Sequence, residues 1–335
     1  MTATIQPDTI LRELSELWVS LGKEAAGETS AGVLRACAMT LVTVAEDSED
    51  ASLIGETVAA LMREHPSRAI VIRFRPAADR ALDARVFAQC WMPFGQRRQI
   101  CCEQIEILAS DLSLPDLPGV IVPLAAADLP LVLWCRSARI LGLPGFAQLA
   151  GVAQKVIFDS AVFPDPKAVL SDAANRLREP YALADLAWTR LTCWRSLVSQ
   201  IFDNRSYLAS VPSISEVRIS FGGASPPVAA YYLAAWLLDS LERAGASPKL
   251  IWEASDGDAG TFHKIALIAH GSAELAVRLE AQGSAVDVSV DHLTACTKLG
   301  SATDYDLLRE ELAIPYRDPI FEKTLMRAAR LPHLS

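Results

Sequence analysis

The sequence lacks the short motifs that identify the common nucleotide-dependent, metal-dependent and acyl-transfer enzymes. It has no Walker phosphate loop, no H-E-x-x-H helix and no nucleophile elbow. The glycine-rich turn of a dinucleotide-binding domain is also missing. Its nearest counterpart, residues 221–227, lacks the third glycine and has two prolines where backbone amides would face a pyrophosphate. That segment indicates a turn capped by Ser225, or at most a small anion pocket at the start of a helix.

Histidine is scarce, and cysteine follows no recognised pattern. Five histidines lie scattered singly, which leaves little from which to build a metal cluster. The seven cysteines are odd in number, and their spacing fits neither a disulfide framework nor a zinc site. Cys101 and Cys102 are adjacent, so a disulfide between them is geometrically difficult. We therefore expect reduced, mostly buried thiols, no metal and no cofactor.

Three further absences restrict the partners and the location. The formal net charge is −9 and no basic stripe is present, so the sequence is not typical of a nucleic-acid-binding protein. The most hydrophobic window, residues 117–135, contains three prolines and Asp128, which argues against a membrane span. Charged residues near the first methionine argue against a secretory signal. We expect a cytoplasmic protein with no membrane or nucleic-acid partner.

The chain does have enough apolar sequence for large cores. Its 335 residues are 51% hydrophobic, with a mean hydropathy of +0.23. Helical spacing and apolar runs alternate, which predicts an α/β fold: two α/β domains with mixed sheets flanked by helices. A proline-rich break at 163–167 places the domain boundary, giving an N-terminal domain of residues 1–162 and a C-terminal domain of residues 163–335. The expected helices are 8–21, 49–64, 168–178, 183–202, 228–243, 304–313 and 319–330, and the expected strands are 35–45, 69–74, 99–109, 131–135, 156–158, 217–221, 249–253, 264–268 and 285–290.

Two segments carry more polar or aromatic groups than their elements require. The strand 99–109 has polar side chains on both faces, which places it near a sheet edge or against a partner; a half-exposed strand with satisfied side chains is an equal alternative. In the predicted helix 183–202, tryptophan and arginine recur at spacings of three and four, as in Arg190 and Trp194. Such residues are enriched at binding hot spots, but a core helix with buried tryptophans explains them as well.

These two segments, with several others in the same order along the chain, resemble the glucose-6-phosphate dehydrogenase assembly protein (OpcA) family of bacteria. The resemblance extends over most of the chain and is most specific in the Cys-Cys-Glu-Gln-Ile-Glu-Ile string and the Trp-Thr-Arg-Leu-Thr segment. It is carried by residues 35–41, 65–68, 99–107, 128–130, 133–134, 185–195 and 232–237.

The resemblance implies a non-catalytic subunit that binds, assembles and allosterically activates glucose-6-phosphate dehydrogenase in the oxidative pentose phosphate pathway. In some relatives, activation responds to thiol redox state, which would concern Cys37, Cys101 and Cys102. The alternative is a protein or enzyme that binds a sugar phosphate through Arg68, Arg97, Arg98 and the segment at Ser225. The expected partner-binding residues are Arg97, Arg98, Glu103, Gln104, Glu106, Trp134, Asp185, Trp188, Arg190, Trp194 and Arg195.

Overall fold

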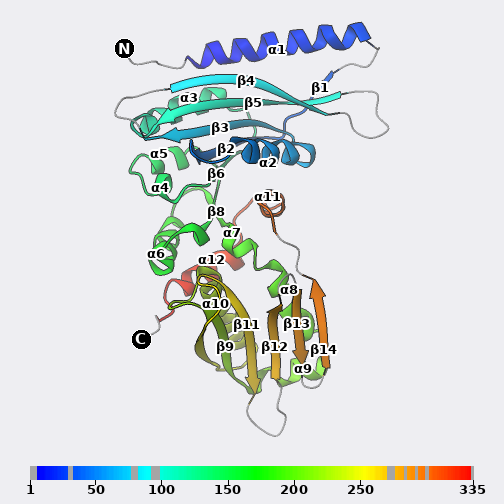
Figure 1. Ribbon diagram of the computed structural model, residues 1–335, viewed down its shortest axis with the longest axis vertical. Helices are drawn as coiled ribbons and strands as arrows, with labels where there is room; N and C mark the ends of the chain where they lie inside the picture. Colours follow the sequence, from blue (N-terminus) through cyan, green and yellow to red (C-terminus); the bar gives the residue numbers. More distant parts are fainter. Residues whose placement is uncertain are drawn as a thin grey trace. The chain divides into compact units, whose positions relative to one another are not determined.

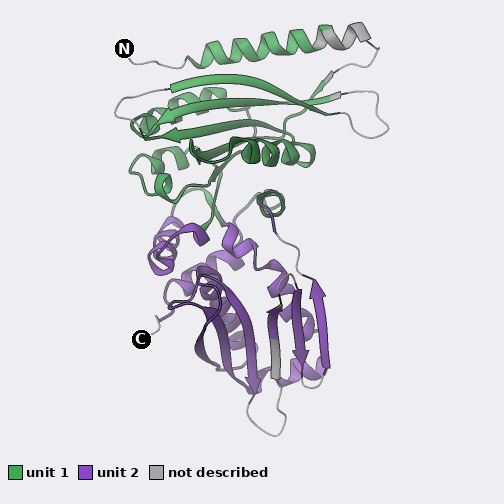
Figure 2. Cartoon of the chain, in the orientation of Figure 1, with its two compact units in different colours: residues 1–159, 179–184, 304–316 green, residues 160–178, 185–303, 317–335 purple. Residues whose placement is uncertain are grey.

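The computed structural model of the chain describes residues 6–28, 33–76, 82–91, 99–269, 276–282, 285–290, 293–298 and 302–332. It forms two compact units, coloured separately in Figure 2. Unit 1 comprises residues 1–159, 179–184 and 304–316, and unit 2 comprises residues 160–178, 185–303 and 317–335. The chain thus passes between the two units more than once. The single domain boundary between residues 162 and 163, expected from the sequence, stays a prediction.

Unit 1 is built on an eight-stranded sheet, with β5 (Gln99–Ser110) followed in order by β3 (Ser67–Arg75), β2 (Met39–Glu46), β6 (Leu131–Cys135) and β7 (Lys155–Phe158). These neighbours are parallel, which explains why β2 is buried at nearly every position. The sheet also includes β1 (Val33–Arg35), β4 (Leu82–Trp91) and β8 (Ala182–Asp185).

Helices cover both faces of this sheet. The helix α2 (Ala51–Glu64) begins at Asp50, whose side chain accepts from the Ser52 amide, and its Ile54, Val58 and Met62 pack on Cys102 of β5. Residues at odd positions of β5 point to the opposite face, toward α1 (Pro7–Glu28) and α3 (Leu117–Leu124). The remaining helices of unit 1 are α4 (Ala138–Leu141), α5 (Phe146–Ala150) and α11 (Asp304–Leu312), with the 3-10 turn η1 (Asp111–Asp116).

Unit 2 has a six-stranded mixed sheet, in the order β10-β9-β11-β12-β13-β14. Figure 1 labels β9, β11, β12, β13 and β14 of this sheet. Only β10 and β9 are parallel; the other neighbours are antiparallel. Their bounds are β9 (Ile214–Gly222), β10 (Lys249–Ser255), β11 (Phe262–Ala269), β12 (Ala276–Gln282), β13 (Ala285–Val290) and β14 (Leu293–Lys298). The helices are α6 (Pro166–Arg176), α7 (Leu186–Thr189), α8 (Thr192–Ile201), α9 (Arg205–Ser210), α10 (Val228–Arg243) and α12 (Pro319–Ala328), with turns η2 (Ser160–Val162) and η3 (Val211–Ser213).

The α/β class expected from the sequence is confirmed, and several local predictions are wrong. The predicted helix 183–202 consists of the end of strand β8, the one-turn helix α7 and the helix α8. The predicted strand 35–45 is interrupted, because β1 and β2 pair with different neighbours. Strands β4, β12 and β14 were not predicted at all. Ser225 caps no helix: α10 begins after Pro227, without a side-chain cap.

Candidate functional site

In unit 1 the predicted partner-binding residue Glu103 is the centre of a buried polar cluster. Its side chain is 3% exposed and accepts from Trp18 Nε1 at 2.6 Å and from Arg68 Nε at 2.5 Å. Arg35 Nη2 lies 2.6 Å from the same carboxylate, and Arg68 also donates to the Leu124 carbonyl at 2.6 Å. One carboxylate therefore joins α1, β1 and β3 to β5. Because its donors come from this chain, Glu103 holds the unit together and presents no free carboxylate.

The neighbouring candidates Gln104 and Glu106 lie on the opposite face of the sheet from Glu103. Side chains alternate along β5, so these two point toward the α2 side. Both are only partly buried. Gln104 accepts from Gln89 Nε2 at 3.2 Å, and Glu106 lies 3.8 Å from Arg73 Nη1. Glu106 also lines a polar cavity of about 190 Å³. Its other lining residues are Asp47, Arg73, Asp83, Arg85 and Leu108. A partner can reach this pair of side chains.

Trp134 and the arginines Arg97 and Arg98 complete the candidates in unit 1. Trp134 is 1% exposed in the centre of the parallel sheet, and the guanidinium of Arg136 lies 4.8 Å from its ring. Arg136 itself is paired with Glu49 at 2.7 Å and with Asp304. Trp134 is therefore part of the core. Arg97 and Arg98 lie outside the described residues.

In unit 2 most residues of the predicted segment 185–195 are buried. Asp185 is fully buried; its Oδ1 accepts from the amides of Ser160 and Ala187 at 3.0 and 2.9 Å, and its Oδ2 accepts from Tyr232 at 2.7 Å. The carboxylate caps α7 and ties it to η2 and α10. Buried carboxylates need such donors, since an unpaired charge in the interior is very costly.

The tryptophans of the same segment pack against aromatic rings of unit 2. Trp188 is 3% exposed, with ring centroids 6.0 Å from Tyr232 and 6.2 Å from Phe321. Trp194 is 6% exposed and lies 4.7 Å from Phe262. Their aromatic neighbours explain the tryptophans as core residues, which is the alternative that sequence reasoning had kept open.

The two arginines of this segment are more accessible than its tryptophans. The Arg195 guanidinium covers the Trp188 ring at 3.6 Å and is half-buried. Arg190 is exposed. Of the predicted residues in unit 2, these two are within reach of a partner.

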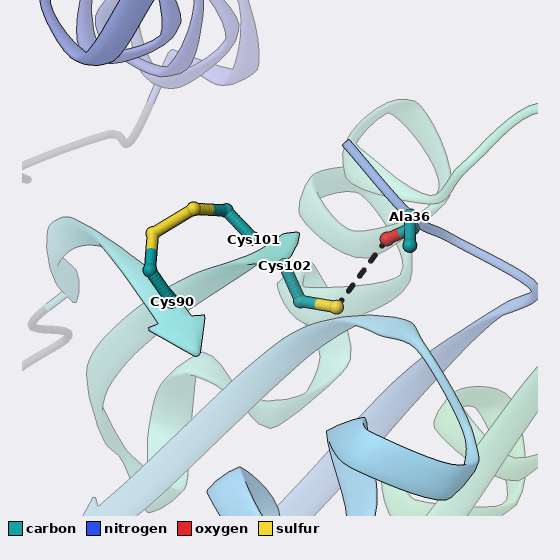
Figure 3. Close-up of a disulfide and its surroundings, with 4 residues drawn as sticks. All are labelled: Ala36, Cys90, Cys101 and Cys102. Atoms are coloured by element: carbon teal, nitrogen blue, oxygen red, sulfur yellow. Dashed lines mark hydrogen bonds between the residues drawn. A yellow bond between two sulfur atoms is a disulfide. The ribbon is translucent and has the colours of Figure 1, made fainter. Parts of the chain in front are cut away.

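The described cysteines include one disulfide, which contradicts the expectation of reduced thiols. Cys90 and Cys101 are register partners on the antiparallel strands β4 and β5, and their sulfurs are bonded (Figure 3). Sequence reasoning missed this bridge because it did not predict β4. Burial raises the pKa of the neighbouring Cys102 thiol to about 11, and its Sγ donates to the Ala36 carbonyl at 3.3 Å (Figure 3).

The free thiols also differ from the expectation that most would be buried. Cys102 and Cys135 are buried, whereas Cys37, Cys193 and Cys296 are exposed. Of the three candidate redox residues, Cys101 is thus in a disulfide, Cys102 is enclosed with a raised pKa, and Cys37 is open to solvent.

A second cavity, of about 240 Å³, lies in unit 2 where β9 leads into α10. Gly222 is required there, because a Cβ at that position would lie 2.3 Å from the Asp258 carbonyl oxygen. Gly223 adopts a φ of +90°, which also favours glycine. The residues that line this cavity carry no charged side chain, so an anion would meet only backbone amides and hydroxyls.

Within the described part of the chain, no group of three or more histidine, cysteine, aspartate or glutamate side chains is arranged to hold a metal ion. None of the described helices combines the length and apolarity needed to cross a bilayer.

The protein is therefore a two-unit α/β protein in which the buried carboxylates Glu103 and Asp185 accept hydrogen bonds from donors of the same chain. Profiles of the two domains of the glucose-6-phosphate dehydrogenase subunit match it: the N-terminal domain over residues 58–175 and the C-terminal domain over residues 181–325. Together they cover well over half of the chain. The protein belongs to the glucose-6-phosphate dehydrogenase assembly protein (OpcA) family.

Relatives named OxPP cycle protein OpcA are found in cyanobacteria. The protein of Synechocystis is 29% identical over 196 residues, which cover 58% of this chain and 40% of the relative. The protein of Nostoc punctiforme is 29% identical over 181 residues, covering 53% and 38%. The matched region thus spans about two-fifths of each of these relatives.

Solved structures with a related arrangement are distant in sequence. Glucose-6-phosphate 1-dehydrogenase from Mycobacterium avium has 11% identity and a TM-score of 0.49, covering 88% of this chain and 91% of that one. Biliverdin reductase from Synechocystis has 13% identity and a TM-score of 0.43, with 87% and 96% covered.

Proposed function

We propose that the protein is a non-catalytic subunit that binds glucose-6-phosphate dehydrogenase, assembles it and activates it allosterically. The observation that supports this proposal most is the match of both domains to the dehydrogenase subunit family. The relatives named OxPP cycle protein OpcA point to the same oxidative pentose phosphate pathway.

The chemistry of the polar centres agrees with a role without catalysis. The buried carboxylates of Glu103 and Asp185 accept hydrogen bonds from donors of this chain, so both are committed to the fold. The anion-site alternative gains no support. Arg68 is 8% exposed and already donates to Glu103 and Leu124, and the cavity near Ser225 has no cationic lining.

Contact with the dehydrogenase is assigned to accessible candidates, foremost Gln104 and Glu106 on β5 with Arg190 and Arg195 in unit 2. Binding that favours the active state of the dehydrogenase shifts its equilibrium only by the difference in affinity between the two states. Couplings of this kind are typically about 1–3 kcal/mol, or roughly 5- to 150-fold in affinity.

The test mixes the purified protein with the dehydrogenase of the same organism. Turnover is measured against glucose-6-phosphate concentration, and complex formation is followed by sedimentation. We expect the two proteins to sediment together as a complex, and the dehydrogenase to show a higher kcat or a lower KM. Glu106→Gln is expected to weaken activation, whereas Glu13→Gln on the exposed side of α1 is not. Separate species with unchanged kinetics would reject the proposal.

A further inference from the structure

The sheet of unit 1 has the strand order of a dinucleotide-binding fold. Its neighbours β5-β3-β2-β6-β7-β8 become 3-2-1-4-5-6 when they are numbered along the chain from β2, leaving out the antiparallel β4. In sheets of this kind, ligands bind at the carboxyl ends of the strands, in the crevice where the strand order reverses. That crevice lies between β2 and β6. A pyrophosphate bound there would meet residues 46–50, the turn from β2 into α2.

This turn has the wrong chemistry for a pyrophosphate. Such a turn needs glycines, because the phosphate groups approach the backbone closely. Residues 46–50 are Glu-Asp-Ser-Glu-Asp and contain no glycine. Two backbone amides of this region already donate to its own carboxylates: the Ser52 amide to Asp50 at 2.8 Å, and the Glu46 amide to Glu49 at 2.9 Å. The residues present therefore do not fit a dinucleotide.

The side chain of Glu46 is held like a bound anion by residues that follow β6. Arg139 donates to both of its carboxylate oxygens, from Nε at 3.0 Å and from Nη2 at 2.6 Å. The Ser137 hydroxyl donates to the same carboxylate. Proteins bind free carboxylates and phosphates through such bidentate arginine contacts. Because the Glu46 side chain is only 22% exposed, most of it is enclosed by these partners.

Two further arginines hold the other carboxylates of the turn. Arg136 pairs with Glu49 at 2.7 Å and with Asp304 at the start of α11. Arg73 of β3 lies 3.3 Å from the carboxylate of Asp47, and it donates to the carbonyl of the same residue at 2.7 Å. Both arginines are therefore paired within the chain, as is the arginine described above.

We propose that residues 46–50 act as an internal anion, which fills the crevice of unit 1 and keeps dinucleotides and other phosphate-bearing ligands out. The charges around the crevice support this proposal. Its three arginines are paired with five carboxylates, an excess of two negative charges; these are the carboxylates of Glu46, Asp47, Glu49, Asp111 and Asp304. A phosphate-bearing ligand would have to displace carboxylates from their arginines and would then be repelled by the remaining ones.

The proposal rests on the geometry of unit 1 and is independent of any contact with the dehydrogenase. It adds to the proposed function one consequence for a complex of the two proteins. A subunit whose own crevice is filled does not compete with the dehydrogenase for a nicotinamide coenzyme.

Binding of NADP+ and of inorganic pyrophosphate to the full-length protein tests whether the crevice is filled. Isothermal titration calorimetry is carried to about 1 mM of each probe, which detects dissociation constants up to the millimolar range. We expect neither probe to bind. Binding of NADP+ or pyrophosphate with a Kd below about 1 mM overturns the proposal.

Glu46→Ala tests whether this carboxylate occupies an anion position. The variant leaves Arg139 and the Ser137 hydroxyl around a hole of carboxylate size, in which formate can accept the same hydrogen bonds. Thermal unfolding is measured while formate is raised from about 1 to about 100 mM at constant ionic strength, so that salt screening does not change. Without formate, we expect the Tm to lie about 3–6 °C below that of the wild type. Formate should recover at least about half of this loss.

Matched variants separate binding in this hole from a general effect of formate. Glu13→Ala, on the exposed side of α1, should respond to formate no more than the wild type does. Glu46→Gln fills the hole with its own side chain, so formate should leave its Tm unchanged. If Glu46→Ala does not fold, Glu49→Ala takes its place, with formate binding to Arg136. Formate that stabilises the folded crevice variant no more than Glu13→Ala overturns the proposal.

Discussion

Removing the hydrogen bond between Tyr232 and Asp185 tests whether Asp185, in the segment 185–195, stabilises the core. Tyr232→Phe removes the hydroxyl that donates to Asp185 Oδ2 at 2.7 Å while leaving the ring in place. Both residues are fully buried, so water does not replace the lost donor. Hydrogen bonds to charged groups contribute about 1.5–3 kcal/mol, and we expect the free energy of unfolding to fall by about 2 kcal/mol.

The consequence is measurable by thermal and urea unfolding. A loss of about 2 kcal/mol lowers the Tm of a unit of this size by about 4–8 °C. Tyr316→Phe is the matched control, because Tyr316 is 80% exposed and its hydroxyl gains little from the fold. Activation of the dehydrogenase, measured well below the Tm, is expected to be unchanged by Tyr232→Phe. A variant that unfolds like the wild type yet fails to activate would refute the conclusion that Asp185 acts within the core.

The remaining predictions concern stability, pH and thiol reactivity. Lys155→Met leaves Glu311 buried without its ion-pair partner at 2.8 Å, so urea unfolding should show a loss of about 3–5 kcal/mol. The double variant Lys155→Met/Glu311→Met should recover part of this loss, because the carbonyls of Glu311 and Ile314 still lack the Lys155 ammonium as a donor. Failure of the double variant to recover would argue against this pairing. The hydrogen bond from Arg327 lowers the pKa of Glu242 in the folded protein. The stability that this pair contributes is therefore complete above the ordinary carboxyl pKa of 4.5, and it is lost as the pH falls through the lower pKa of the folded state. Because the Glu242 side chain is 47% exposed, the contribution is at most about 1 kcal/mol. Arg327→Gln should therefore reduce the dependence of the free energy of unfolding on pH below pH 4.5. The same pH dependence in the variant and the wild type would contradict the stabilisation of Glu242 by Arg327. Iodoacetamide at about pH 8 should modify Cys37 and Cys193 but spare Cys102, because its thiol is buried with a pKa of about 11; mass spectrometry showing equal labelling would contradict this.

Much of the fold was predictable from patterns that local physics imposes. Strand β2 is apolar on both sides because parallel strands between helix layers are buried on both faces, and this run was recognised. The alternation along β5 was also predicted correctly, with Gln104 and Glu106 opposite Glu103. Strands β4 and β12 were missed, because their sequences include helix-favouring alanine, glutamate, leucine and arginine, and only pairing with β5 and with β11 and β13 makes them strands.

The sequence by itself therefore determined the fold class and the family, because period-two and period-3.6 patterns and an ordered set of segments are properties of the chain. Tertiary structure alone decided which polar and aromatic residues face solvent. Trp188, Trp194 and Asp185 have the composition of a binding surface, yet their partners Phe321, Phe262 and Tyr232 come from elements far along the chain. The same holds for Cys101, whose partner Cys90 is fixed by strand register. Burial depends on what folds over a segment, and no local pattern contains that information.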